Sequence, residues 1–114
     1  MSVITWREPR FDLTTYDTEN LRQQFAERLR GRALRAYFFG SFATGTVTHE
    51  SDIDLVLIKE TAEHFVSRPL EFMDLFDIFP RLDVLVYTPA EFQRMLERED
   101  GFFKSATLSE ICLT

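Results

Sequence analysis

Hydrophobic positions along the chain follow two different periods, and the changes of period predict the elements. After an opening segment without a clear period, up to about Tyr16, residues 17–31 carry apolar side chains at helical spacing. Such spacing is typical of an amphipathic helix, for which Asp17 or Thr18 is a suitable N-cap and Gly31 a suitable C′ residue. We expect the opening segment to form an extended arm or an edge strand.

Three short apolar runs have the character of β-strands, because they are rich in β-branched or aromatic residues and too short for stable helices. They are residues 33–39 (ALRAYFF), 52–58 (DIDLVLI) and 81–88 (RLDVLVYT). Further helices are predicted at residues 68–80 and 89–100, each with a proline near its first turn. The remaining residues, 101–114, are expected to form a short helix or a tail.

The order of these elements predicts the α/β (α+β) class, with a small mixed β-sheet of three strands and flanking helices. The helix between the second and third strands allows those strands to be parallel without requiring it. A helical period over residues 68–80 places Leu70, Met73 and Phe79 on one wide apolar face, together with Leu75 or Phe76. The 114 residues are expected to form one domain, residues 1–114.

Composition and charge exclude several classes of protein. The net charge is -6 and the arginines are scattered, so direct binding to nucleic acid is not expected. A single cysteine, Cys112, allows no internal disulfide, which fits a reducing cytoplasm. The sequence shows neither the apolar core of a signal peptide nor a segment of about 20 apolar residues that would span a membrane. We therefore expect a cytoplasmic protein without membrane attachment.

Candidate chemistry lies at the starts of the second and third strands. Because side chains alternate along a strand, Asp52 and Asp54 share one face, and Asp83 has an equivalent early position in the next strand. If the two strands are neighbours, three carboxylates can converge. Their repulsion requires water or a counter-charge, and Mg²⁺ is the cation that such oxygen ligands suit. Two ions of this kind would support an in-line nucleotidyl displacement.

A Gly-Ser pair ends the first strand. Gly40 would let the backbone approach a phosphate closely, and the hydroxyl of Ser41 could hold one. Taken singly, a Gly-Ser pair is more often a plain turn, and an Asp-x-Asp sequence is more often a cap or a solvated strand end. The ordered combination of strand, Gly-Ser, Asp-Ile-Asp and a third strand led by an aspartate favours a site.

The stretch GSFATGTVTHESDID has a Gly-Ser pair, ten residues, and then Asp-x-Asp. This pattern resembles the DNA polymerase β-like nucleotidyltransferase superfamily, and the short chain looks like its minimal, MNT-type branch. The resemblance covers residues 34–87 and implies a palm-like fold. It implies that Gly40 and Ser41 bind the triphosphate of ATP, that Asp52 and Asp54 hold two Mg²⁺ ions, and that Asp83 is a third metal-binding carboxylate that helps to activate the acceptor hydroxyl.

The resemblance also implies a partner. Proteins of the MNT-type branch are commonly antitoxins paired with a HEPN-domain ribonuclease toxin, and they transfer AMP from ATP to a tyrosine of that toxin. The expectation is thus a protein adenylyltransferase in a hetero-oligomer, the antitoxin of a type VII-like toxin–antitoxin pair. One alternative is a non-catalytic antitoxin or adaptor that neutralises its partner by binding alone. Another is an enzyme that modifies a small molecule such as an aminoglycoside, but those resemble this family with an added acceptor domain.

Overall fold

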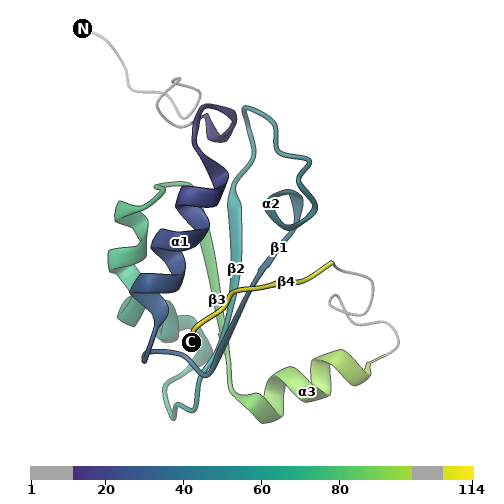
Figure 1. Cartoon of the computed structure of the whole chain (residues 1–114). Coiled ribbons are helices and arrows are strands. Elements are labelled where there is room, and N and C mark those ends of the chain that lie inside the picture. The colour runs from purple at the N-terminus through teal and green to yellow at the C-terminus, as the bar shows by residue number, and fades with distance from the viewer. Residues whose placement is uncertain (1–11, 99–106) are drawn as a thin grey trace, which may run out of the picture.

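The computed structural model describes residues 12–98 and 107–114. It shows a four-stranded mixed sheet with helices on both faces (Figure 1). The strands are β1 (Arg35–Phe39), β2 (Ile53–Ile58), β3 (Leu82–Tyr87) and β4 (Ser109–Glu110), in the order β3-β2-β1-β4. β1 is antiparallel to β2 and to β4, whereas β2 and β3 are parallel. The helical elements are η2 (Leu13–Thr15), α1 (Thr18–Leu29), α2 (Ser41–Thr44), η3 (Phe65–Asp77) and α3 (Pro89–Glu97). The predicted fold class is confirmed.

Alternation along β2 sets the two faces of the sheet. Ile53, Leu55 and Leu57 are fully buried in the larger core, which α1 and η3 cover. Val56 and Ile58 point to the opposite face, where α3 packs through Phe92. Each such buried side chain contributes about 1.5–3 kcal/mol to folding. The predicted division of this strand into two faces is therefore confirmed.

The ends of α1 also agree with the sequence analysis. The Asp17 carboxylate accepts hydrogen bonds from the backbone N–H groups of Glu19 at 3.1 Å and Asn20 at 3.2 Å, so Asp17 is the N-cap. Gly31 follows the C-cap residue and has a φ of 78°, a left-handed conformation that favours glycine. The helix therefore stops at the predicted glycine.

The segment between β2 and β3 departs from the predicted α-helix. η3 is a 3₁₀ helix that begins at Phe65, and Phe72 interrupts it with a φ of -113° and a ψ of 21°. Phe72 and Leu75 are buried, but Leu70 is 68% and Met73 53% exposed. Placing Leu70 and Met73 on the buried face was wrong, because the 3.6-residue period does not apply across an interrupted 3₁₀ helix with three residues per turn.

Two short elements were not predicted. α2 lies in the connection between β1 and β2, for which no helix was predicted, and β4 pairs with β1 where a short helix or tail was expected. The opening arm, predicted up to Tyr16, contains the 3₁₀ turn η2. Its residues 1–11 lie outside the described part of the chain, as do residues 99–106.

Within the described residues no helix combines the length and apolar character needed to cross a membrane.

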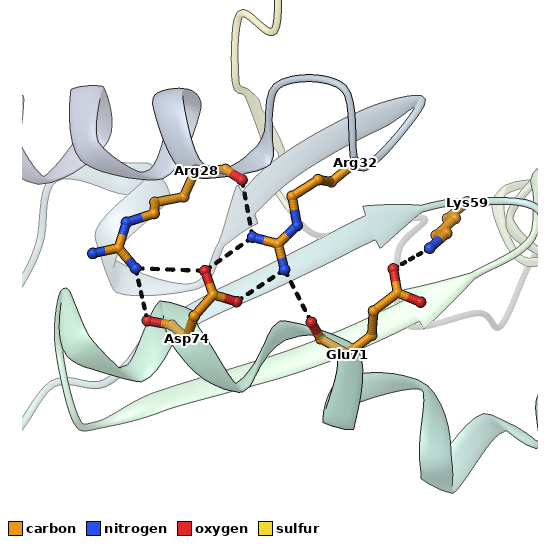
Figure 2. Close-up of polar contacts among 5 residues, drawn as sticks. All are labelled: Arg28, Arg32, Lys59, Glu71 and Asp74. Atoms are coloured by element: carbon orange, nitrogen blue, oxygen red, sulfur yellow. Dashed lines mark hydrogen bonds and ion pairs between the residues drawn. The ribbon is translucent and has the colours of Figure 1, made fainter.

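A network of charged side chains holds η3 against the end of α1 (Figure 2). The guanidinium of Arg32 donates to both carboxylate oxygens of Asp74, each at 2.9 Å, and to the carbonyl of Glu71 at 2.9 Å. Arg28 donates to the carbonyl of Asp74 at 3.0 Å, and Lys59, just after β2, pairs with the carboxylate of Glu71. The hydrogen bonds from Arg32 lower the pKa of Asp74. These contacts fix the connection that brings β3 back beside β2.

A second ion pair joins η3 to α3 around the β3 edge of the sheet. Arg68, whose side chain is 9% exposed, donates to the two carboxylate oxygens of Glu91 at 2.6 and 3.2 Å and to the carbonyl of Val86 at 3.0 Å. Glu91 also accepts from the backbone N–H of Thr88, which completes a capping box at the start of α3. The hydrogen bonds from Arg68 are the main reason that the pKa of Glu91 falls to about 2.

Glu91→Gln tests this ion pair, because it keeps the side chain's capping oxygen but removes its charge. The folded-state pKa lies below the ordinary 4.5, so the stabilisation is present above that pH and is lost as the pH falls toward about 2. We expect the substitution to lower the free energy of unfolding at neutral pH by about 1 kcal/mol, after allowance for solvent screening, and to flatten the acid limb of the stability curve.

Urea denaturation over a series of pH values measures both effects. Glu97→Gln is the matched control, because Glu97 is an exposed residue of the same helix. If both variants show the acid dependence of the parent protein, the Arg68–Glu91 pair contributes nothing to stability.

Candidate active site

The start of the parallel pair β2–β3 brings acidic side chains together. The register pairs Asp54 directly with Asp83, so the two side chains lie beside each other on the face that also carries Val56. Asp54 is partly buried and Asp83 is exposed. Asp52 stands just before β2 with the same phase and is exposed. Convergence required the two strands to be neighbours, and the structure meets this condition for Asp54 and Asp83.

Gly40 lies against Asp54 at the end of β1. The antiparallel register pairs Phe39 with Asp54, so the next residue of the chain passes close to the carboxylate. Gly40 has a φ of 71°, and a Cβ atom at this position would lie 2.5 Å from Oδ2 of Asp54. Both the backbone conformation and the close contact therefore require glycine.

Ser41 is the first residue of α2 and is partly exposed. The carbonyl of Gly40 accepts from the backbone N–H groups of Ala43 at 3.1 Å and Thr44 at 3.2 Å, which closes the single turn of this helix. Ser41 thus follows directly on the residue that touches Asp54. The phosphate-binding role expected for Gly40 and Ser41 stays a prediction.

Arg22 of α1, which the sequence analysis did not single out, holds α2 in place. Its guanidinium donates to the carbonyl of Phe42 at 3.0 Å and to the hydroxyl of Ser109 at 3.2 Å, and it lies 4.8 Å from the centre of the Phe42 ring. A four-residue helix has little stability of its own, so such tertiary contacts determine where Ser41 lies. No local sequence signal distinguishes Arg22 from other polar positions of an amphipathic helix.

Arg81 is the second residue that the sequence analysis missed. Its Nε donates to Oδ1 of Asp52 at 2.8 Å, and its Nη2 donates to the carbonyl of Glu50. The counter-charge for Asp52 is thus part of the protein, where the sequence analysis considered only water or a bound cation. The available signal was strand phase, because Arg81 stands two residues before Asp83 and shares its face.

The remaining pair, Asp54 and Asp83, has no such counter-charge. Neither carboxylate forms an ion pair with a cationic side chain of the described residues. Burial, followed by the negative charges of Asp83 and Asp52, raises the pKa of Asp54 to about 6. Across residues 12–98 and 107–114, no three His, Cys, Asp or Glu side chains are grouped closely enough to form a metal site.

These residues fit a divalent cation by the chemistry of their donor atoms. Mg²⁺ takes oxygen ligands, usually only one or two of them protein carboxylates, and completes its shell with water and substrate phosphates. The Asp54–Asp83 pair supplies two such carboxylates on a partly exposed face, without a compensating cation in the described part of the chain. The arrangement can therefore hold a cation and, through it, a phosphorylated ligand.

A surface hollow of about 590 Å³ lies away from this pair. It is lined by residues of η3, the end of β3 and α3, among them Phe65, Tyr87 and Met95. Tyr87 stands at the opposite end of β3 from Asp83, and no residue of the candidate site lines the hollow. Size alone therefore does not identify the active site of this chain.

Asp54→Asn should stabilise the protein in the absence of divalent cations. The folded-state pKa of about 6 lies above the ordinary 3.8, so the free energy of unfolding declines as the pH rises between these values, where the unfolded chain releases a proton that the folded chain retains. Above this range the variant should be more stable than the parent by about 1 kcal/mol, after allowance for partial exposure.

Urea denaturation in EDTA at about pH 7.5 and about pH 4 measures the difference, which should shrink at the lower pH. Asp52→Asn is the matched control, because Asp52 raises the pKa of Asp54 less than burial and Asp83 do and its removal also weakens the contact with Arg81, so it should give no gain in stability. Equal effects of the two substitutions at the higher pH would show that the folded protein does not disfavour the charged form of Asp54.

Similarity to known proteins bears on the site independently of this geometry. Residues 19–113 match the family model described as "Polymerase beta, Nucleotidyltransferase", and the matched region contains the Gly-Ser pair and all three aspartates. The same chain finds no match among curated proteins. The match confirms the resemblance to the polymerase β-like superfamily and supports nucleotidyl transfer in general. The chain belongs to the polymerase β nucleotidyltransferase family.

Proposed function

We propose that this chain is a Mg²⁺-dependent nucleotidyltransferase that transfers AMP from ATP to a protein hydroxyl. The observation that carries the proposal is the pairing of Asp54 with Asp83 beside the backbone of Gly40, two carboxylates that find no cationic partner among residues 12–98 and 107–114. The family match supports nucleotidyl transfer without specifying donor or acceptor. ATP, Mg²⁺ and the protein acceptor are the finer parts of the proposal.

Asp54 and Asp83 would hold Mg²⁺, and Asp52 would complete the set for a second ion. When bound, these cations supply positive charge that stabilises the triphosphate and the developing charge of the transition state. Gly40 lets the backbone come close to the phosphates, and the hydroxyl of Ser41 donates a hydrogen bond to the β or γ phosphate. The residues of the chain thus place ATP across the starts of β2 and β3.

The proposed step is an in-line displacement. The acceptor oxygen forms a bond to the α-phosphorus of ATP, the bond from that phosphorus to the bridging oxygen breaks, and pyrophosphate leaves. The proton of the acceptor hydroxyl passes to the carboxylate of Asp83, which is the more exposed member of the pair. AMP remains on the acceptor.

The acceptor is proposed to be a tyrosine of a HEPN-domain toxin, for which this chain is the antitoxin in a hetero-oligomer. One observation favours a macromolecular acceptor. Asp52 and Asp83 are both exposed, so the site is open toward solvent and accessible to a side chain of another protein. The identity of the partner rests on the resemblance to the MNT-type branch.

Transfer of label from ATP to the partner tests the proposal. The protein is incubated with Mg²⁺ and the HEPN-domain product of a neighbouring gene, in one series with ATP labelled at the α-phosphate and in another with ATP labelled at the γ-phosphate. We expect only the α label on the partner, with a mass increase of whole AMP units. Asp54→Asn should reduce the rate more than about a hundredfold, because it removes a cation ligand.

Asp77→Asn, an exposed aspartate of η3, is the matched control and should leave the rate unchanged. Incorporation of the γ label would show phosphoryl transfer instead. If neither label is incorporated and Asp54→Asn still protects cells against the induced toxin, the chain neutralises its partner by binding alone.

A further inference from the structure

Four charged residues form two successive pairs at the start of the parallel strands. The register sets Asp54 beside Asp83, and the ladder begins one residue earlier with Ile53 and Leu82, where the backbone N–H of Ile53 donates to the carbonyl of Arg81 at 2.9 Å. Asp52 and Arg81 lie just before the ladder, each two residues ahead of its aspartate on the same face, and their side chains form an ion pair. One pair combines opposite charges, and the next combines two negative charges.

The guanidinium of Arg81 is held firmly on Asp52. It contacts one oxygen of that carboxylate through Nε at 2.8 Å and the carbonyl of Glu50 through Nη2, so it spans the turn that leads into β2. The side chain of Arg81 is 17% exposed, compared with 46% for Asp52. Arginine does not lose its proton in proteins, so Asp52 becomes available to another cation only when the guanidinium moves away.

We propose that Arg81 is a positioning residue, a built-in counter-ion that withholds Asp52 from divalent cations until the nucleotide is bound. The inference rests on the proposed function and adds an order of events to it. Of the three aspartates, Asp54 and Asp83 are then left to bind a divalent cation in the nucleotide-free protein. Asp52 joins a second ion once the triphosphate brings that ion with it, because a lone cation must displace Arg81.

The charge of Arg81 also lowers the affinity of the free site. Arg81 stands two residues before Asp83 on the same face of the sheet, and its positive charge repels a cation bound by Asp54 and Asp83. Removal of that charge should therefore strengthen binding of a divalent cation in the absence of nucleotide. A purely structural role for Arg81 predicts the opposite, since a loosened turn would bind the cation more weakly.

Titration with Mn²⁺, followed by the electron paramagnetic resonance signal of the free ion, tests the inference without any measurement of activity. The nucleotide-free parent should bind one Mn²⁺ per chain. Arg81→Gln should bind Mn²⁺ about tenfold more tightly or more, and with a second ion per chain. Arg81→Lys, which keeps the positive charge, should stay within about threefold of the parent. Asp54→Asn should lose the site.

The results separate the inference from the proposed function. If the parent binds Mn²⁺, Asp54→Asn abolishes binding, and Arg81→Gln binds equally or more weakly, then the role of Arg81 is overturned while the proposed metal site stands. If neither the parent nor Arg81→Gln binds Mn²⁺, the proposed function itself fails. Circular dichroism and thermal unfolding in EDTA check that each variant folds. Arg81→Met, which keeps the apolar stem, replaces Arg81→Gln with the same expected result if the latter is unfolded.

Discussion

The repulsion between Asp54 and Asp83, maintained by the parallel register of β2 and β3, is the constraint on which the rest of the site depends. A shift of one residue would relieve the repulsion, but it would also turn Ile53, Leu55 and Leu57 out of the core. These three side chains are fully buried, so the shift would lose several kcal/mol of hydrophobic stabilisation, at about 1.5–3 kcal/mol each. Burial on one face therefore holds the acidic pair on the other.

Several contacts stabilise the segments that position the acidic residues at the starts of β2 and β3. The hydrogen bonds of Arg32 to Asp74 and of Arg68 to Glu91 anchor η3, which returns the chain from β2 to β3. Gly40 gives the chain a conformation that lets it pass the carboxylate of Asp54. A site that concentrates like charges reduces stability, and such a loss is typical where function requires a destabilised arrangement. The ion pairs of η3 therefore help to offset the loss of stability caused by Asp54 and Asp83, which have no cationic partner in the described part of the chain.

Much of this site could be predicted from the sequence, because it depends on local patterns. The two-residue period gave Asp54 and Asp83 equivalent early positions in their strands, and the register pairs them. The combination of a Gly-Ser pair, ten residues and Asp-x-Asp indicated the family that the family model confirms. The period of η3 misled, because a break at Phe72 separates two short helical turns. Arg22 and Arg81 act through contacts with residues 20 or more positions away, which a local pattern does not reveal.

The position of a bound divalent cation tests most directly whether Asp54 and Asp83 form the metal site. Crystals grown with Mn²⁺ and a non-hydrolysable α,β-methylene analogue of ATP would show the ion by its anomalous scattering. We expect an anomalous peak in contact with the carboxylates of both Asp54 and Asp83, with the triphosphate beside Gly40 and Ser41. A bound nucleotide whose Mn²⁺ lies elsewhere, with neither Asp54 nor Asp83 among its ligands, would contradict this expectation.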